Sequence, residues 1–263
     1  MKKRKKKTGI ITLLICILAI FGGLLFFLGT KEEKSKSLDS QKASEMEEAG
    51  DGTIEINIQE IPGFITGGEE STCGLELPYQ IPGTALTIER IGQYSGEFVE
   101  DGSSEPSANV LSLVVRNDSN AFVEYADITF TVNDSEQASF EISGVPANKY
   151  VLVMEKGKRE FNSEDTLVYE TQLYAERGDV SLKDDMIKVS TADGELTAEN
   201  ISKTPLEAVY IRYKTKILPE CYLGGITYSC TIEELADGEE KSAKTGHFSD
   251  KFSEIVMVET VEK

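Results

Sequence analysis

The chain has 263 residues, of which 46 are acidic and 27 basic, so its net charge is −19. Such an acidic surface repels phosphate backbones and anionic lipid headgroups, which argues against nucleic acid as a partner. The single histidine and the four cysteines are too few for most zinc sites, and there is no tryptophan. We therefore expect no cofactor and no metal.

The N-terminal segment has the pattern of a membrane anchor. Residues 2–7 are all basic, and residues 8–30 contain no charged side chain. About 20 apolar residues in a helix cross a bilayer, and basic flanks stay in the cytoplasm. We expect a cytoplasmic tail at 1–7, a single transmembrane helix at 8–30 in the cell membrane, and an extracytoplasmic remainder. The alternative is a cleaved signal peptide, although "LFFLGTKEEK" lacks a small-x-small cleavage site.

The expected extracytoplasmic part begins with a polar stalk at residues 31–71. Beyond it, short runs of alternating apolar residues are separated by Gly, Pro, Asn, Asp and Ser, which is typical of antiparallel β-structure. Excluding residues 2–7, this chain carries 21 basic and 46 acidic residues, a net charge of −25. We expect strands at 84–91, 110–115, 126–132, 138–142, 150–154, 167–175, 186–189, 195–199, 209–217, 226–235 and 253–261.

Two stretches of the chain repeat each other. "VRNDSNAFVEYADITF" (115–130) aligns with "AENISKTPLEAVYIRY" (198–213), and Asn117 and Ser119 match Asn200 and Ser202. In each copy an Asn/Ser-rich turn precedes a strand with alternating apolar residues, because these side chains hydrogen-bond nearby backbone in reversals. A third match follows, "ISGVPANK" (142–149) against "IEELADGE" (232–239). The repeat predicts two related β-sandwich modules, at 72–160 and 161–263.

The order of strand, "N-x-S" turn, strand, then an apolar residue and a Gly- or Asn-containing turn resembles the FxLYD and CARDB types of small Ig-like module. The resemblance covers about 40 residues of each expected module, without a literal Phe-x-Leu-Tyr-Asp string. The chain is also similar to uncharacterised membrane-anchored proteins of Gram-positive bacteria. The resemblance implies an all-β fold with two tandem Ig-like antiparallel sandwiches, acting as adaptors or ligand binders without catalysis.

One strand face has a candidate for contact with a partner. Tyr210, Arg212, Lys214 and Lys216 alternate with apolar residues, so we expect them to share the solvent side of a strand. An aromatic ring and three cations in an acidic protein suggest contact with an anionic wall polymer or an acidic partner. The alternative is a solvated face whose cations are neutralised by neighbouring acidic residues.

Three cysteines lie beyond the expected membrane helix, Cys73, Cys221 and Cys230. An odd number leaves at least one of them unpaired in a monomer. Cys221 and Cys230 could form a disulfide if the segment between them folds back. If that segment is one extended strand, the two sulfurs are too far apart. Pairing of Cys73 with either of them, or three reduced thiols, are the other possibilities.

Residues that could carry out catalysis are sparse. His247 lies near Ser249 and Asp250, but no Gly-x-Ser-x-Gly elbow accompanies them. "EDGSSE" (100–105) is rich in oxygen ligands yet lacks the spacing of a calcium loop, so a plain turn is the alternative. Gly224 and Gly225 favour a bulge or bend at the start of a strand.

From these features we expect a non-catalytic, membrane-anchored interaction protein. It would bind an envelope polymer or a partner membrane protein. An alternative is an accessory subunit of a membrane complex that contacts its partners through the transmembrane helix. A carboxylate-dependent hydrolase is a further alternative, although no carboxylate pair stands out from the abundant acidic residues.

Overall fold

The computed structural model describes residues 55–178 and 180–263. Within these ranges no helix is long and apolar enough to cross a membrane. The cytoplasmic tail expected at 1–7, the transmembrane helix expected at 8–30 and the stalk up to residue 54 lie outside the described residues. The described part of the chain is all-β apart from one short 3₁₀ helix, η1 (Ile58–Glu60), as the sequence predicts.

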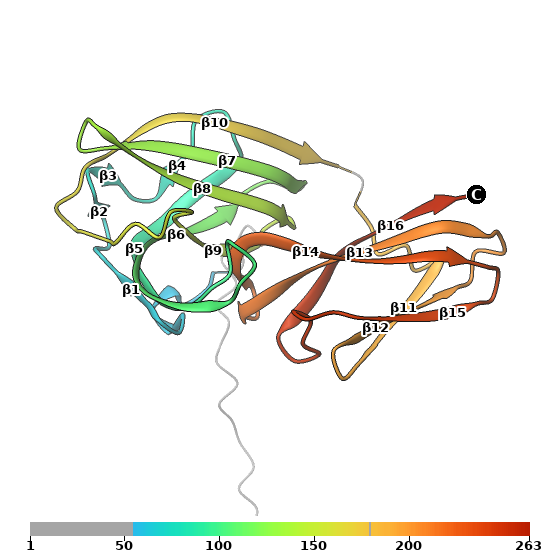
Figure 1. Ribbon diagram of the computed structural model, residues 1–263. Helices are drawn as coiled ribbons and strands as arrows, with labels where there is room; N and C mark the ends of the chain where they lie inside the picture. Colours follow the sequence, from blue (N-terminus) through green and yellow to red (C-terminus); the bar gives the residue numbers. More distant parts are fainter. Residues whose placement is uncertain (1–54, 179) are drawn as a thin grey trace, which may run out of the picture. The chain divides into compact units, whose positions relative to one another are not determined.

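The strands form four sheets (Figure 1). The eight-stranded sheet contains β1 (Phe64–Thr66), β4 (Tyr79–Gln80), β5 (Leu86–Phe98), β6 (Glu105–Asn117), β9 (Tyr150–Met154), β13 (Leu206–Leu218), β14 (Cys221–Leu235) and β16 (Ser253–Glu262). The two three-stranded sheets are β10 (Leu167–Arg177), β7 (Phe122–Val132) and β8 (Glu136–Val145), and β11 (Ile187–Ala192), β12 (Glu195–Asn200) and β15 (Glu240–Lys244). The two-stranded sheet joins β2 (Ser71–Thr72) and β3 (Leu75–Glu76).

Every strand expected from the sequence coincides with an observed one. Alternating apolar residues identify these strands because each buries one face, as Ala126, Ile128 and Phe130 do completely. Strand β15 was missed because its sequence, "EKSAK", has no apolar alternation. The short strands β1 to β4 were also missed, since two or three residues are too few to show a period.

The strand pairing of residues 86–177 is repeated in residues 187–262. In the first range β6 pairs with β5 and β9, and β7 pairs with β10 and β8. In the second range β12 pairs with β11 and β15, and β13 pairs with β16 and β14. All of these pairs are antiparallel. The two sets of strands therefore pair in the same order, and in each set a hydrophobic core lies between the two sheets.

The repeated Asn residue forms the same turn in both ranges, beginning with Asn117. Its fully buried amide donates to the carbonyls of Ala121 at 2.9 Å and Val145 at 3.1 Å. Its Oδ1 accepts the backbone N–H of Ser119 at 3.0 Å. One side chain thus holds the turn after β6 and fastens it to the end of β8.

Asn200 makes the corresponding bonds in the second range. Its buried amide donates to the carbonyls of Thr204 at 2.7 Å and Leu235 at 3.1 Å, and its Oδ1 accepts the Ser202 N–H at 3.0 Å. Leu235 occupies the position that aligns with Val145 in the third sequence match. The repeated sequence therefore encodes a repeated hydrogen-bond network, and the alignment of 142–149 with 232–239 agrees with it.

The observed strand pairing and burial assign two segments differently from the expected domain limits. Strand β10 pairs with β7, although it lies beyond the expected boundary at 160/161. Residues 56–64, expected in the stalk, cover an apolar face of the large sheet, where Ile61 and Phe64 are buried. Both differences arise because an exposed part of the first set of strands needs a partner that the sequence repeat does not reveal. Strand β10 pairs with the edge of β7, and residues 56–64 cover the outer face of β5, β6 and β9.

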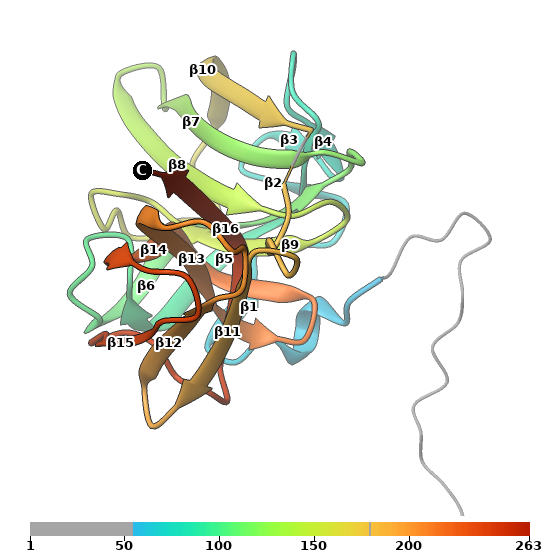
Figure 2. The same ribbon diagram turned by 90° about the vertical axis from the view of Figure 1, so that its right-hand side faces the viewer.

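The hairpin of β13 and β14 connects the two sets of strands. At its tip, β14 pairs in parallel with β9 through residues 221–223, while the rest of the hairpin packs against β11 and β12 (Figures 1 and 2). Cys221 and Leu223 join the core that covers the outer face of β9. The described residues, 55–178 and 180–263, consequently belong to one compact unit.

We expect Asn117→Ala and Asn200→Ala each to lower the free energy of unfolding by about 2–3 kcal/mol, because each change leaves buried backbone carbonyls without a donor. Urea denaturation measures the loss. Asn120→Ala is the control, since Asn120 lies in the same turn but is exposed, and it should change stability by less than about 0.5 kcal/mol. A loss that small for either buried Asn would contradict the structural role assigned to it.

Candidate functional site

The structure divides the four residues of the predicted contact face. Tyr210 is 37% exposed, whereas Lys214 is fully buried. Arg212 pairs with Glu259 at 2.9 Å, and Lys216 pairs with Glu254 at 3.6 Å. The expectation that all four share one solvent face is therefore corrected for Lys214. The two exposed cations have acidic partners on β16, which corresponds to the neutralised face that the sequence left as the alternative.

A bulge in β14 explains the inward direction of Lys214. Tyr213 pairs with Tyr228, but Thr215, two residues later, pairs with Leu223. Residues 224–227, here called the β14 bulge, therefore stand opposite Lys214 alone. The bulge brings the carbonyls of Gly225 and Ile226 over this position of β13, so Lys214 is covered there, whereas Lys216, two residues later, reaches Glu254 on β16.

Glycine is required at the start of the β14 bulge. Gly224 has a φ of +78°, a left-handed conformation, and a Cβ on Gly225 would lie 1.7 Å from the carbonyl oxygen of Glu141. The bulge or bend predicted from this Gly-Gly pair is confirmed.

Lys214 donates hydrogen bonds to backbone carbonyls at the β14 bulge that have no strand partners. Its Nζ donates to the carbonyl oxygens of Ile226 at 2.7 Å, Ser143 at 2.9 Å and Gly225 at 3.0 Å. An ammonium group has three N–H donors, so three acceptors satisfy it. Because Ser143 belongs to β8, the same side chain joins the bulge to the facing sheet.

Glu100 accepts hydrogen bonds from backbone N–H groups of the same region. Its Oε1 accepts the backbone N–H of Met154 at 2.8 Å and that of Gly225 at 3.0 Å. Glu100 thus accepts from the N–H of Gly225, and Lys214 donates to the carbonyl oxygen of the same residue. Burial raises the pKa of Glu100 to about 7, opposed by these N–H donors and by the Lys214 charge. Burial lowers the pKa of Lys214 to about 7, opposed by the Glu100 charge.

Asp101, the second carboxylate of the loop at 100–105, is also hydrogen-bonded within the protein. Asp101 Oδ1 accepts the backbone N–H of Ser103 at 2.9 Å, and its Oδ2 pairs with Lys158 at 3.0 Å. Within the described ranges no three His, Cys, Asp or Glu side chains are grouped in a way that could hold a metal ion. The geometry at 100–105 is that of an Asp-Gly turn in which Glu100 and Asp101 are held by protein donors.

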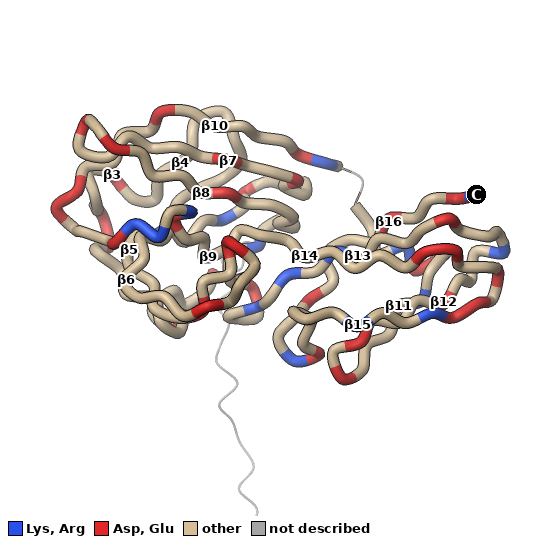
Figure 3. Tube along the Cα trace, viewed as in Figure 1, with Lys and Arg blue, Asp and Glu red and all other residues tan. Residues whose placement is uncertain are grey.

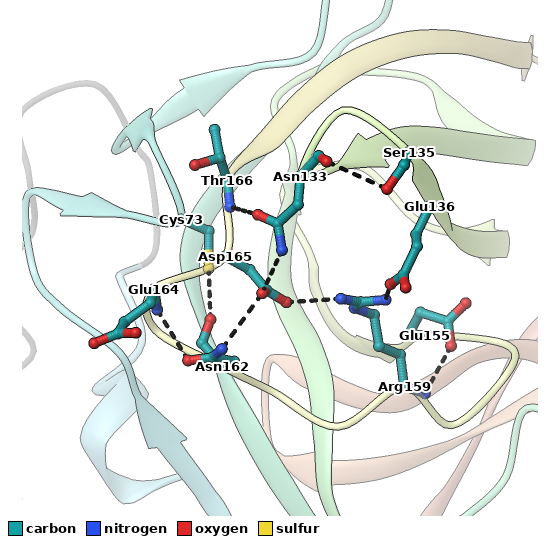
Figure 4. Close-up of polar contacts among 10 residues, drawn as sticks. All are labelled: Cys73, Asn133, Ser135, Glu136, Glu155, Arg159, Asn162, Glu164, Asp165 and Thr166. Atoms are coloured by element: carbon teal, nitrogen blue, oxygen red, sulfur yellow. Dashed lines mark hydrogen bonds and ion pairs between the residues drawn. The ribbon is translucent and has the colours of Figure 1, made fainter.

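A second polar cluster surrounds Asp165 (Figure 4). Its carboxylate accepts from Arg159 Nη2 at 2.9 Å and from Asn133 Nδ2 at 2.8 Å. Asn133 in turn accepts the backbone N–H of Thr166 at 2.9 Å. The cluster fastens the segment before β10 to the turn between β7 and β8. Figure 4 shows these side chains pointing at one another, which suits a structural role.

Cys73, beside this cluster, has the properties of an inert thiol. It is buried and donates to the carbonyl of Asn162 at 3.7 Å. Burial raises the pKa of Cys73 to about 11, and the Asp165 charge adds to the effect. The reactive form of cysteine is the thiolate, so this environment suppresses nucleophilic chemistry.

The disulfide considered between Cys221 and Cys230 does not form. Cys73, Cys221 and Cys230 are all free and buried. Cys221 and Cys230 lie in the one strand β14, nine residues apart, and belong to different cores. An extended strand rises about 3.3 Å per residue, so it holds the two cysteines much farther apart than a disulfide allows.

His247 stands in an aromatic stack at the edge of a groove. Its ring stacks on Tyr228 with centroids 4.6 Å apart, and Tyr228 stacks on Tyr213 at 5.5 Å. The groove, here called the Tyr228 groove, has a volume of about 470 Å³ and also contacts Glu97 and Phe252. The groove could not be predicted from the sequence, because its lining comes from segments more than 100 residues apart.

Neither protein-family models nor the curated proteins give a match to this chain. The function is therefore argued from the residues. Acidic residues are spread over the strands and turns of the described part and not gathered in one place (Figure 3). The two features that stand apart from this background are the half-buried Glu100 with the buried Lys214 at the β14 bulge, and the exposed aromatic rings of the Tyr228 groove.

We expect Lys214→Met to lower the free energy of unfolding by about 3 kcal/mol or more, because it leaves three carbonyls and Glu100 without their cation. Chemical denaturation measures the change. Lys216→Met is the matched control on the same strand, and its exposed pair contributes at most about 1 kcal/mol. Equal losses in the two variants would contradict the role of Lys214.

Replacement of Glu100 by Gln should change how stability depends on pH. Because the folded pKa is raised, the contribution of Glu100 is present below its ordinary pKa of 4.5 and is lost as the pH rises to about 7. Gln does not titrate, and one oxygen can still accept both N–H groups. Between about pH 5 and pH 7 the wild type should therefore lose up to about 3 kcal/mol more than Glu100→Gln.

Urea denaturation at several pH values tests this difference. Glu97→Gln, an exposed carboxylate on the preceding strand, serves as the control and should follow the wild type. Parallel pH profiles for the wild type and Glu100→Gln would show that Glu100 titrates as an ordinary surface carboxylate.

Proposed function

We propose that this chain is a membrane-anchored, extracytoplasmic interaction protein without catalytic activity. The sequence supports the anchor, because a basic block at 2–7 precedes an uncharged segment at 8–30. The described part supports a scaffold that presents loops and grooves at fixed positions, which is the usual arrangement of binding surfaces. The partner would be an envelope polymer or a membrane protein.

The observation that carries this proposal is the repeated strand order with its two buried Asn turns. We propose that the two ranges are tandem Ig-like modules of the FxLYD or CARDB type, with the second beginning after β10 and not at residue 161. The shared hairpin of β13 and β14 supports a rigid pair, because its bulge is held by Lys214 and Glu100. A rigid pair of modules suits an adaptor that holds a partner at a set distance from the membrane.

The environments of the reactive side chains also fit a role in binding. Burial raises the pKa of Cys221 to about 12, as it does that of Cys73 to about 11, which disfavours both thiolates. His247 uses its ring face to stack on Tyr228.

In-cell cross-linking of the tagged full-length chain, followed by mass spectrometry, tests the proposal. We expect a small, reproducible set of membrane proteins or wall fragments cross-linked to residues of 55–263. Replacement of residues 8–30 by an unrelated membrane helix is the control, and it should leave this capture unchanged. Loss of capture after the replacement would favour an accessory subunit that contacts its partners through the helix.

A further inference from the structure

The Tyr228 groove combines exposed aromatic faces with hydroxyl groups. Tyr213, which is buried, supports Tyr228, and Tyr228 supports the exposed ring of His247. Phe252, on the same groove, is 51% exposed, and the Lys251 ammonium lies over one face of its ring, 4.8 Å from the centroid. Aromatic faces held in this way offer flat apolar surfaces to a ligand that is itself flat and only partly polar.

The polar lining of the groove is rich in hydroxyl groups and poor in free positive charge. Its side chains include those of Ser103, Ser104, Ser249 and Ser253. Ser103 Oγ donates to Asp101 at 2.6 Å and Ser253 Oγ accepts the Ser249 N–H at 3.0 Å, and each hydroxyl keeps a further donor or acceptor position for a ligand that carries hydroxyls of its own. The charged side chains among its lining residues, apart from His247, are Glu97 and Lys216, and Lys216 is already paired with Glu254 at 3.6 Å.

The wall formed by the loop after β5 is held in place. Val99 is buried, and a Cβ on Gly224 would lie 2.1 Å from its Cγ2 atom, so the loop and the β14 bulge are in close contact. The next residue, Glu100, is bonded to the backbone of Met154 and Gly225. A groove whose wall is already fixed loses little entropy on binding.

We propose that the Tyr228 groove binds a neutral saccharide chain, one pyranose ring stacking on His247 and Phe252 and its hydroxyls bonding to the serine-lined wall. Pyranose rings have apolar C–H faces and hydroxyl edges, the two properties that this lining complements. The acidic surroundings oppose an anionic polymer. This inference rests on the proposed function and gives its envelope ligand a site and a chemical class.

Isothermal titration calorimetry of the full-length chain in detergent micelles, with the tetramer of N-acetylglucosamine as the probe, tests the inference. We expect the wild type to bind and His247→Ala and Phe252→Ala each to raise the Kd about three- to tenfold, the effect of losing one aromatic contact. Tyr210→Ala removes an exposed ring outside the groove and should leave the Kd unchanged. Thermal denaturation confirms that each variant is folded.

Three results would overturn the inference: no binding by the wild type, a Kd that neither groove substitution alters, or tighter binding of polyglycerol phosphate than of the neutral tetramer. In-cell cross-linking of His247→Ala separates this failure from failure of the proposed function. If the tetramer does not bind but the variant still captures partners, the groove assignment fails and the adaptor function stands. If neither the wild type nor the variant captures a partner, the adaptor function itself fails.

Discussion

The contact between Lys214 and the β14 bulge is the interaction on which the described architecture depends. Beyond the bulge, residues 221–223 of β14 pair with β13 on one side and with β9 on the other, but the bulge itself strips backbone groups of their strand partners. Buried backbone polar groups need partners, and a cation for the carbonyls together with a carboxylate for the N–H groups provides them. Lys214 and Glu100 thereby allow one hairpin to belong to two hydrophobic cores.

The two repeated sets of strands show how one set can come to be joined to the other. Asn117 and Asn200 hold the same turn in each set, so each set keeps its own order of pairing. The second set differs where its hairpin is extended beyond the bulge, and residues 221–223 of that extension pair with the edge of β9 and add to the core on its outer face. Burying this extra apolar surface stabilises the pair as one unit. The contact between the two sets of strands thus comes from an addition to one copy and not from the repeated sequence.

This arrangement also creates the one groove in the described residues to which we give a ligand. The loop after β5 and the segment before β16 approach each other because Glu100 joins the first to the bulge from which Tyr228 follows. The aromatic stack begins in the core at Tyr213 and ends at the surface at His247. Support from a core gives exposed rings a defined orientation, which a loop alone would not do.

The sequence by itself determined the all-β class, the positions of the long strands, the Asn turns and the bulge at Gly224 and Gly225, because alternation, turn chemistry and glycine geometry are local properties. It could not place Lys214, since the bulge whose carbonyls cover this side chain is set by the pairing of β13 with β14. Nor could it join Glu100 to Gly225 or bring Glu97 near His247. Those contacts link residues over 100 positions apart, and only the tertiary structure decides them.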